Sequence, residues 1–227
     1  MCEVIHANYH LLSVINSLGI KLGFGDKTIQ SICIQDGLDI DFFLMVINAY
    51  TFPEYFSNNT IPAIEPKTLI EYLQNTHKYY LKAILPALNE LINQLTVSHA
   101  QSTKSTLIQR FYKDCVKDFT NHIEFEEQVV YPYIVELANF EKSNKSKEDF
   151  TEISSKILDF NKKHVDIVSK LFDLKNILLK YFSAPDDDLV IHILFLLFRF
   201  EKDLLEHSRL EDFVLIPKIA ELEQKIF

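Results

Sequence analysis

The chain has 227 residues, of which 48% are hydrophobic and 12% aromatic, and its formal net charge is -9. A chain of this length and apolar content forms one well-buried core, with room for a small accessory unit, and is not disordered. Lysines and arginines are scattered among more numerous acids, so the surface repels a phosphate backbone and we expect no nucleic-acid partner.

The first ten residues, MCEVIHANYH, lack the basic start and apolar centre of a secretory signal. The longest apolar run, Leu189 to Phe198, is interrupted by His192 and is much shorter than the roughly 20 residues of a membrane span. We therefore expect a cytoplasmic protein with no transmembrane helix and no membrane partner. The three cysteines are widely spaced, which disfavours a disulfide framework and a thiolate zinc site.

The composition changes near residue 60. All four glycines lie in the first 40 residues, and the remainder, which has none, is suited to long uninterrupted helices. Three prolines separated by polar residues interrupt any periodic pattern between residues 53 and 66, which is typical of a linker. We therefore predict a small N-terminal domain at 1–52, a linker at 53–66 and a main domain at 67–227.

Apolar residues in the main domain recur at three- and four-residue spacing, the period of an amphipathic helix. Four long stretches carry this period: residues 67–96, 103–140, 147–182 and 187–225. The segments between them are short and contain polar residues or proline, and short connections join antiparallel neighbours. The sequence therefore predicts an all-α protein built on an up-down-up-down four-helix bundle.

The second and fourth predicted helices contain the same motif, a histidine followed four residues later by a glutamate and then by a proline. The motif reads His122, Glu126 and Pro132, and recurs 85 residues later as His207, Glu211 and Pro217. Each proline removes a backbone hydrogen bond and is expected to bend the end of its helix. The first and third helices each carry one histidine near mid-length, His77 and His164. This pattern predicts two helical hairpins related by an approximate two-fold axis.

Residues four apart lie one turn apart on the same helix face, so each motif directs one imidazole and one carboxylate to a shared interior point. With the two single histidines, the set has four imidazoles and two carboxylates and can hold two metal ions if each glutamate bridges them. These ligands include no thiolate and suit iron or manganese, with zinc as an open alternative. Iron is favoured because bridging carboxylates hold two ions close and leave positions for an oxo bridge or a small molecule.

The structural alternative for either motif alone is a surface ion pair, which is common and contributes little. Both motifs lie among apolar neighbours such as Phe119 and Leu210, where an unpartnered histidine or glutamate is costly, and the repetition favours a metal site. His192 lies 15 residues before His207, about 22 Å along one helix, and is excluded from that site. Nearby tyrosines either line the site or fill the core, and core filling is the default reading: Tyr79, Tyr80, Tyr131 and Tyr133.

The twofold His-x-x-x-Glu motif, with a proline after each and one histidine before each, resembles the hemerythrin-like family over about residues 67–222. The set of four histidines and two glutamates is similar to its iron–sulfur cluster repair branch, also called repair of iron centres. The resemblance implies a non-haem di-iron centre, oxo- and carboxylate-bridged, in a hemerythrin-like bundle. The implied ligands, with both glutamates bridging, are His77, His122, Glu126, His164, His207 and Glu211.

The N-terminal segment also resembles the small helical domain that precedes the bundle in that branch, especially at residues 17–25 and 37–41. That domain usually carries two adjacent cysteines in a loop, but here the loop reads Leu22-Gly23-Phe24-Gly25. In the first bundle helix, the distance from His77 to Leu85-Pro86 differs by one residue from the family pattern.

Three functions follow in order of preference. The first is repair of damaged iron–sulfur proteins after oxidative or nitrosative stress, by iron donation or by processing of nitric oxide. The second is a module that binds or senses the diatomic ligands O2 or NO. The third is a structural helical bundle whose histidines are vestigial.

Overall fold

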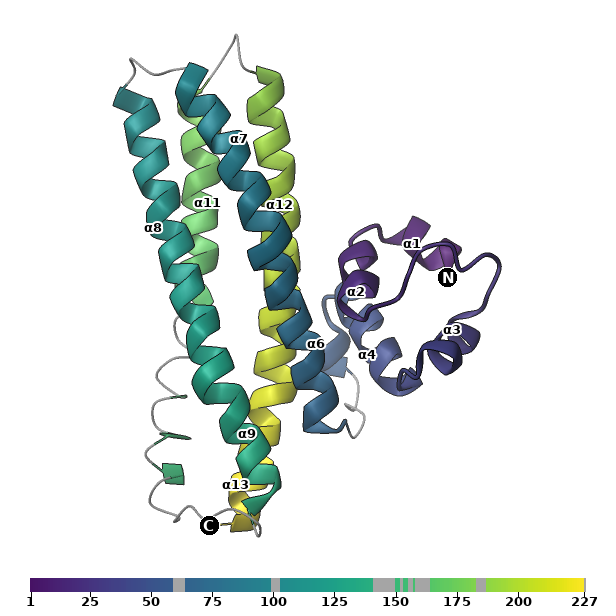
Figure 1. Cartoon of the computed structure of the whole chain (residues 1–227). Coiled ribbons are helices and arrows are strands. Elements are labelled where there is room, and N and C mark those ends of the chain that lie inside the picture. The colour runs from purple at the N-terminus through teal and green to yellow at the C-terminus, as the bar shows by residue number, and fades with distance from the viewer. Residues whose placement is uncertain are drawn as a thin grey trace. The chain divides into compact units, whose positions relative to one another are not determined.

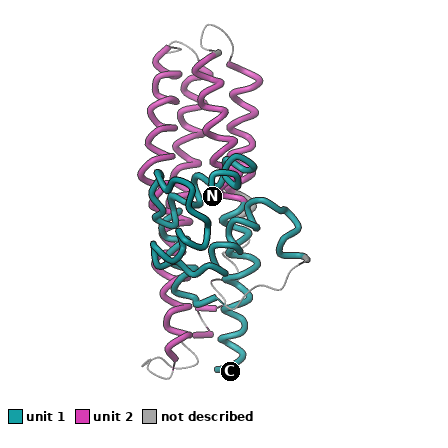
Figure 2. Tube along the Cα trace, turned by 90° about the vertical axis from the view of Figure 1, so that its right-hand side faces the viewer, with its two compact units in different colours: residues 1–76, 206–227 teal, residues 77–205 magenta. Residues whose placement is uncertain are grey.

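The computed structural model describes residues 1–58, 64–98, 103–140, 150–151, 153–154, 157, 164–182 and 187–226. Every regular element among these residues is a helix, which confirms the all-α class (Figure 1). No helix within them is long and apolar enough to cross a membrane. The chain divides into two compact units, residues 1–76 with 206–227 and residues 77–205, coloured separately in Figure 2. The domain boundaries at 52 and 66 stay a prediction.

The first unit begins with five short helices. These are α1 (Cys2–Ala7), α2 (Leu11–Ser17), α3 (Ile29–Asp36), α4 (Ile40–Thr51) and α5 (Tyr55–Asn58), the last of them within the predicted linker. Local capping defines α3 and α4, because the side chains of Thr28 and Asp39 accept the backbone N–H groups of Ser31 and Phe42. Gly37 ends α3 with φ of 67°, a left-handed conformation that glycine adopts without steric cost. The N-terminal segment is therefore helical, as the resemblance implied.

The same unit contains most of α6 (Pro66–Tyr79), the last residues of α12 (Asp187–Leu210), the turn η5 (Glu211–Leu215) and α13 (Ile216–Ile226). Arg209 joins this last stretch to the N-terminal helices. Its guanidinium donates to the backbone carbonyls of Ala49 and Pro53 and to the buried carboxylate of Glu206, and it lies over the ring of Phe56. The helix that carries His207 and Glu211 is thereby held on α4 and α5.

The second unit is a bundle of long helices. Its members are the turn η1 (Tyr80–Ile84), α7 (Leu85–Ser98), α8 (Thr103–Phe125), the turn η2 (Glu126–Val130), α9 (Tyr131–Ala138), α11 (His164–Tyr181) and α12 up to Leu205. Figure 1 shows α7, α8, α11 and α12 side by side, with successive helices antiparallel. Most of the first half of the predicted third helix, 147–182, lies outside the described residues.

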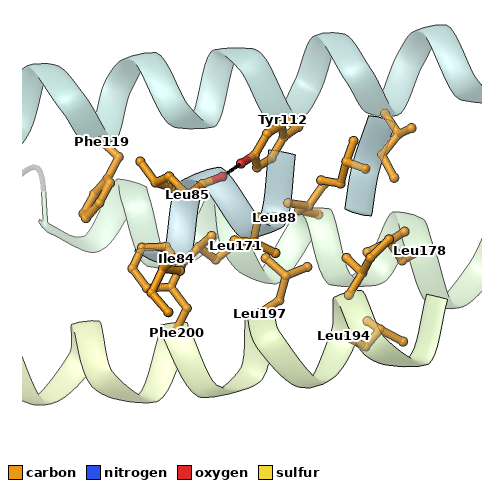
Figure 3. Close-up of a cluster of buried hydrophobic side chains, with 14 of the residues drawn as sticks. Ile84, Leu85, Leu88, Tyr112, Phe119, Leu171, Leu178, Leu194, Leu197 and Phe200 are labelled. Carbon is orange, nitrogen blue, oxygen red and sulfur yellow. Dashed lines mark hydrogen bonds between the residues drawn. The ribbon is translucent and has the colours of Figure 1, made fainter. Parts of the chain in front are cut away.

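The interior of the bundle is apolar and closely packed (Figure 3). Three of its helices contribute side chains that are at most 1% exposed: Leu88 from α7, Leu174 from α11, and Ile193 and Leu197 from α12. Full burial of such a side chain stabilises the fold by roughly 1.5–3 kcal/mol. The dashed line in Figure 3 marks the hydrogen bond that the Tyr112 hydroxyl donates to the carbonyl of Leu85 at 2.9 Å.

Among the described residues, three π-helical turns interrupt the long helices, and each begins six residues before a proline. They are η1 before Pro86, η2 before Pro132 and η5 before Pro217. In each turn the residue that precedes the proline donates its N–H to the carbonyl five residues earlier, namely Leu85 to Tyr80, Tyr131 to Glu126 and Ile216 to Glu211. Proline has no N–H to donate and its ring clashes with the carbonyl four residues earlier, and the wider turn accommodates both effects. Each of these prolines is followed by further helix, and the bend expected at Pro132 and Pro217 stays a prediction.

Candidate metal centre

Five of the six predicted ligands have described side chains, and all five are buried. His77 lies in α6, His122 at the end of α8 and His207 in α12, while Glu126 and Glu211 are the first residues of η2 and η5. Each of the two glutamates is 2% exposed. Removing a carboxylate from water is costly unless it is paired or coordinates a metal.

In the bundle unit, the Glu126 carboxylate lies between two imidazoles. Its Oε1 is 2.9 Å from His122 Nε2 and its Oε2 is 3.2 Å from His77 Nε2. The other ring nitrogen of His77, Nδ1, is 2.9 Å from Oε1 of Glu127. The Tyr131 ring stacks on the His77 ring with centroids 5.7 Å apart, so this tyrosine lines the site.

In the other unit, the second motif has the same internal arrangement. His207 Nε2 is 3.3 Å from Glu211 Oε1, one turn along the helix. The Nδ1 atom of His207 is 2.7 Å from the hydroxyl of Thr76, a buried residue of α6. All three predicted ligand histidines with described side chains therefore direct Nε2 toward a glutamate.

Four of these residues form a group that could hold a metal ion. His77, Glu126, His207 and Glu211 each offer a ligand atom, and the four atoms lie within 4.8 Å of one another. Two imidazole nitrogens and two carboxylate oxygens suit iron, manganese or zinc, so the donor chemistry fits a cation. His122 lies outside this group of four but contacts Glu126. His164 begins α11, and its side chain lies outside the described residues, so its role as a ligand stays a prediction.

The four tyrosines near the motifs differ in whether they line the site or fill the core. Tyr131 lies against His77, whereas Tyr80 packs against Phe119 and Phe200 in the bundle core. The hydroxyl of Tyr133 donates to the carbonyl of Phe150 at 3.2 Å. Burial raises the pKa of Tyr79, while the guanidinium of Arg199, which donates to its hydroxyl, acts in the opposite direction.

Sequence reasoning missed Thr76 and the role of Glu127. A signal for Thr76 was present, because it precedes Pro86 by ten residues, as His122 and His207 precede their own prolines. The first bundle helix thus repeats the proline register of the other two, with Thr76 at the histidine position and His77 one residue later. Glu127 directly follows the predicted ligand Glu126, and this position alone does not show that it contacts His77.

The fold and the site together define a helical bundle of the metal-binding class. The family model for the hemerythrin HHE cation-binding domain matches residues 68–219. Because this match spans more than half of the chain and includes all six predicted ligands, the chain belongs to the hemerythrin HHE family. No curated protein matches the chain.

Proposed function

We propose that this protein holds two iron ions and uses them to repair damaged iron–sulfur proteins under oxidative or nitrosative stress. The proposed ligands are His77, His122, Glu126, His164, His207 and Glu211, with both glutamates bridging the ions. The observation that carries the proposal is the buried His/Glu group, whose four ligand atoms lie within 4.8 Å of one another. The choice of the repair branch is supported by the fourfold histidine and twofold glutamate set and by the small helices that precede the bundle.

The protein residues set the properties of such a centre. The two buried carboxylates supply negative charge that offsets part of the charge of the ions, and the neutral imidazoles complete each ligand set. The described side chains of the proposed ligands are buried, which restricts water at the site. When bound, iron in this site supplies coordination positions that exchange small ligands such as O2 or NO, because six protein ligands do not fill two octahedral ions.

Repair by donation requires that an ion can leave the site, whereas a sensor must retain its ions. Buried ligands and open coordination positions are compatible with both. The resemblance to the repair branch favours donation, and it can be tested directly by transfer of iron from loaded protein to an oxidant-damaged iron–sulfur enzyme.

A second candidate function is reversible binding or sensing of O2 or NO. The observation that favours it is the loop Leu22–Gly25, which has no cysteine where the repair branch usually carries a pair. Cys33 does not replace the pair, because it is buried and burial raises the pKa of its thiol, which keeps it protonated and unreactive.

The deciding experiment incubates iron-loaded protein with an oxidant-damaged iron–sulfur enzyme and measures both recovered activity and iron left on the protein. Recovery with loss of iron supports repair, and the Glu211→Ala variant should restore nothing. The His192→Ala variant is the matched control, because His192 is an exposed histidine of the same helix. Reversible NO or O2 binding with full iron retention and no recovery would replace repair by sensing.

A further inference from the structure

The hydroxyl of Thr76 has two neighbours and only one proton. It donates to the carbonyl of Leu73 at 2.7 Å, and it lies 2.7 Å from Nδ1 of His207. Thr76 is 1% exposed and His207 is 2% exposed, so water does not compete for these contacts. These two contacts therefore constrain which ring nitrogen of His207 carries a proton.

Only one arrangement satisfies both contacts. A carbonyl oxygen cannot donate, so the Thr76 proton is used on Leu73 and the threonine oxygen must accept from His207. In the neutral imidazole, which is the form that binds a metal, Nδ1 of His207 then carries the ring proton and Nε2 keeps its lone pair. That lone pair faces Glu211, whose Oε1 is 3.3 Å away. The ring is held in the tautomer and orientation that a metal ligand needs.

His77 reaches the same state through a different partner. Its Nδ1 is 2.9 Å from Oε1 of Glu127, and an ionised carboxylate accepts but does not donate. Nδ1 is therefore the protonated nitrogen, and Nε2 faces Glu126 Oε2 at 3.2 Å. Glu127 has a 30% exposed side chain, so it lies at the edge of the site and not among the buried ligands.

We propose that Thr76 and Glu127 are positioning residues, which hold His207 and His77 in the tautomer that presents Nε2 to a metal ion. The proposal rests on the metal-binding part of the proposed function and does not depend on repair. Groups that orient a ligand imidazole in this way typically change metal affinity by about 10–100-fold when they are removed. Thr76 acts as a neutral acceptor and Glu127 as a charged one.

The test measures the affinity for Fe2+ and for Co2+ by chelator competition, together with the visible absorption spectrum of the Co2+ form. Thr76→Val removes the hydroxyl at nearly constant volume and should lower affinity by about 10–100-fold. Thr76→Ser keeps the hydroxyl and should restore both the affinity and the Co2+ spectrum. Thr96→Val is the matched control, because Thr96 makes the same bond to the carbonyl three residues earlier and contacts no ligand histidine.

Glu127 is tested in the same assay. Glu127→Ala should lower affinity by about 10–100-fold, and Glu127→Gln, whose amide oxygen still accepts from Nδ1, should lose less. Glu124→Ala, an exposed acid of the same stretch, should leave affinity unchanged. Circular dichroism of the metal-free variants identifies any that fail to fold, and Thr76→Ser then decides the case for threonine.

The outcomes separate this proposal from the proposed function. If wild-type protein binds metal and Thr76→Val and Glu127→Ala bind it equally well, the positioning role is wrong and the metal centre stands. If Thr76→Val changes the Co2+ spectrum and Thr76→Ser does not show the wild-type spectrum, the role of the hydroxyl is also contradicted. If wild-type protein binds neither ion, the proposed function itself fails.

Discussion

Lys175 of α11 and Glu201 of α12 form an ion pair inside the bundle unit, and breaking it should destabilise the protein strongly. The side chains of Lys175 and Glu201 are 5% and 17% exposed, and the ammonium also lies 4.1 Å from the centroid of the Phe198 ring. Removing one partner of a buried pair costs about 3–5 kcal/mol, because the other charge stays desolvated. Glu201 retains some access to water, which reduces that cost, and loss of the cation–π contact adds about 0.5–1 kcal/mol.

The Lys175→Met substitution, which keeps most of the side-chain volume, should therefore lower the free energy of unfolding by about 3 kcal/mol. The double variant Lys175→Met with Glu201→Leu removes both charges and should be close to wild type, because an apolar pair avoids the desolvation cost. Urea denaturation followed by circular dichroism measures wild type, the two single variants Lys175→Met and Glu201→Leu, and the double variant. Equal stability of wild type and Lys175→Met, or a double variant as unstable as the sum of the single ones, would refute the reasoning.

The remaining predictions concern thiols, metal content and one turn. Burial raises the pKa of Cys115 to about 12, so in native protein a thiol reagent should modify exposed Cys2 and spare Cys115 until the chain unfolds. Because the pKa of the thiol in the unfolded chain is near 9.0, Cys115 lowers the free energy of unfolding as pH rises from about 9 to 12. Denaturation of a Cys115→Ala variant across that range checks this. In the proposed di-iron centre Glu126 would bridge both ions, so Glu126→Ala should lose both irons by metal analysis, whereas His192→Ala should keep them. An iron-depleted His192→Ala protein would contradict the proposed site. Gly37→Ala should cost about 1 kcal/mol in thermal unfolding, because its φ is 67°, and an unchanged melting temperature would argue against that strain.

The helical architecture was readable from the sequence, because its signals are local. The stretches predicted at 67–96, 103–140 and 187–225 correspond to helical segments at Pro66–Ser98, Thr103–Ala138 and Asp187–Ile226. Apolar spacing of three and four residues identifies a helix and its inward face without reference to any other part of the chain. The pairing of His122 with Glu126 and of His207 with Glu211 was equally local, since residues four apart share a face.

The sequence predicted that the prolines disturb their helices but did not predict in what form. Each proline indicates that a backbone hydrogen bond of the helix is missing. Either a bend or a π-helical turn relieves the clash between the proline ring and the carbonyl four residues earlier. The choice depends on whether the following segment can continue along the bundle, which is a property of the packing around it. In this protein the helix continues, and Glu126 and Glu211 become the first residues of the wider turns.

The sequence by itself determined the helices that the structure describes, their inward faces and the residue types of the candidate site, because a residue's position within one helix sets all three. Only the tertiary structure decided which partner holds each histidine. Thr76 meets His207 across 131 residues and Glu127 meets His77 across 50, while Arg209 joins the last helix to the carbonyl of Ala49. Such contacts depend on the rotation and offset of one packed helix against another, and helical periodicity defines which face turns inward without defining the atom it meets.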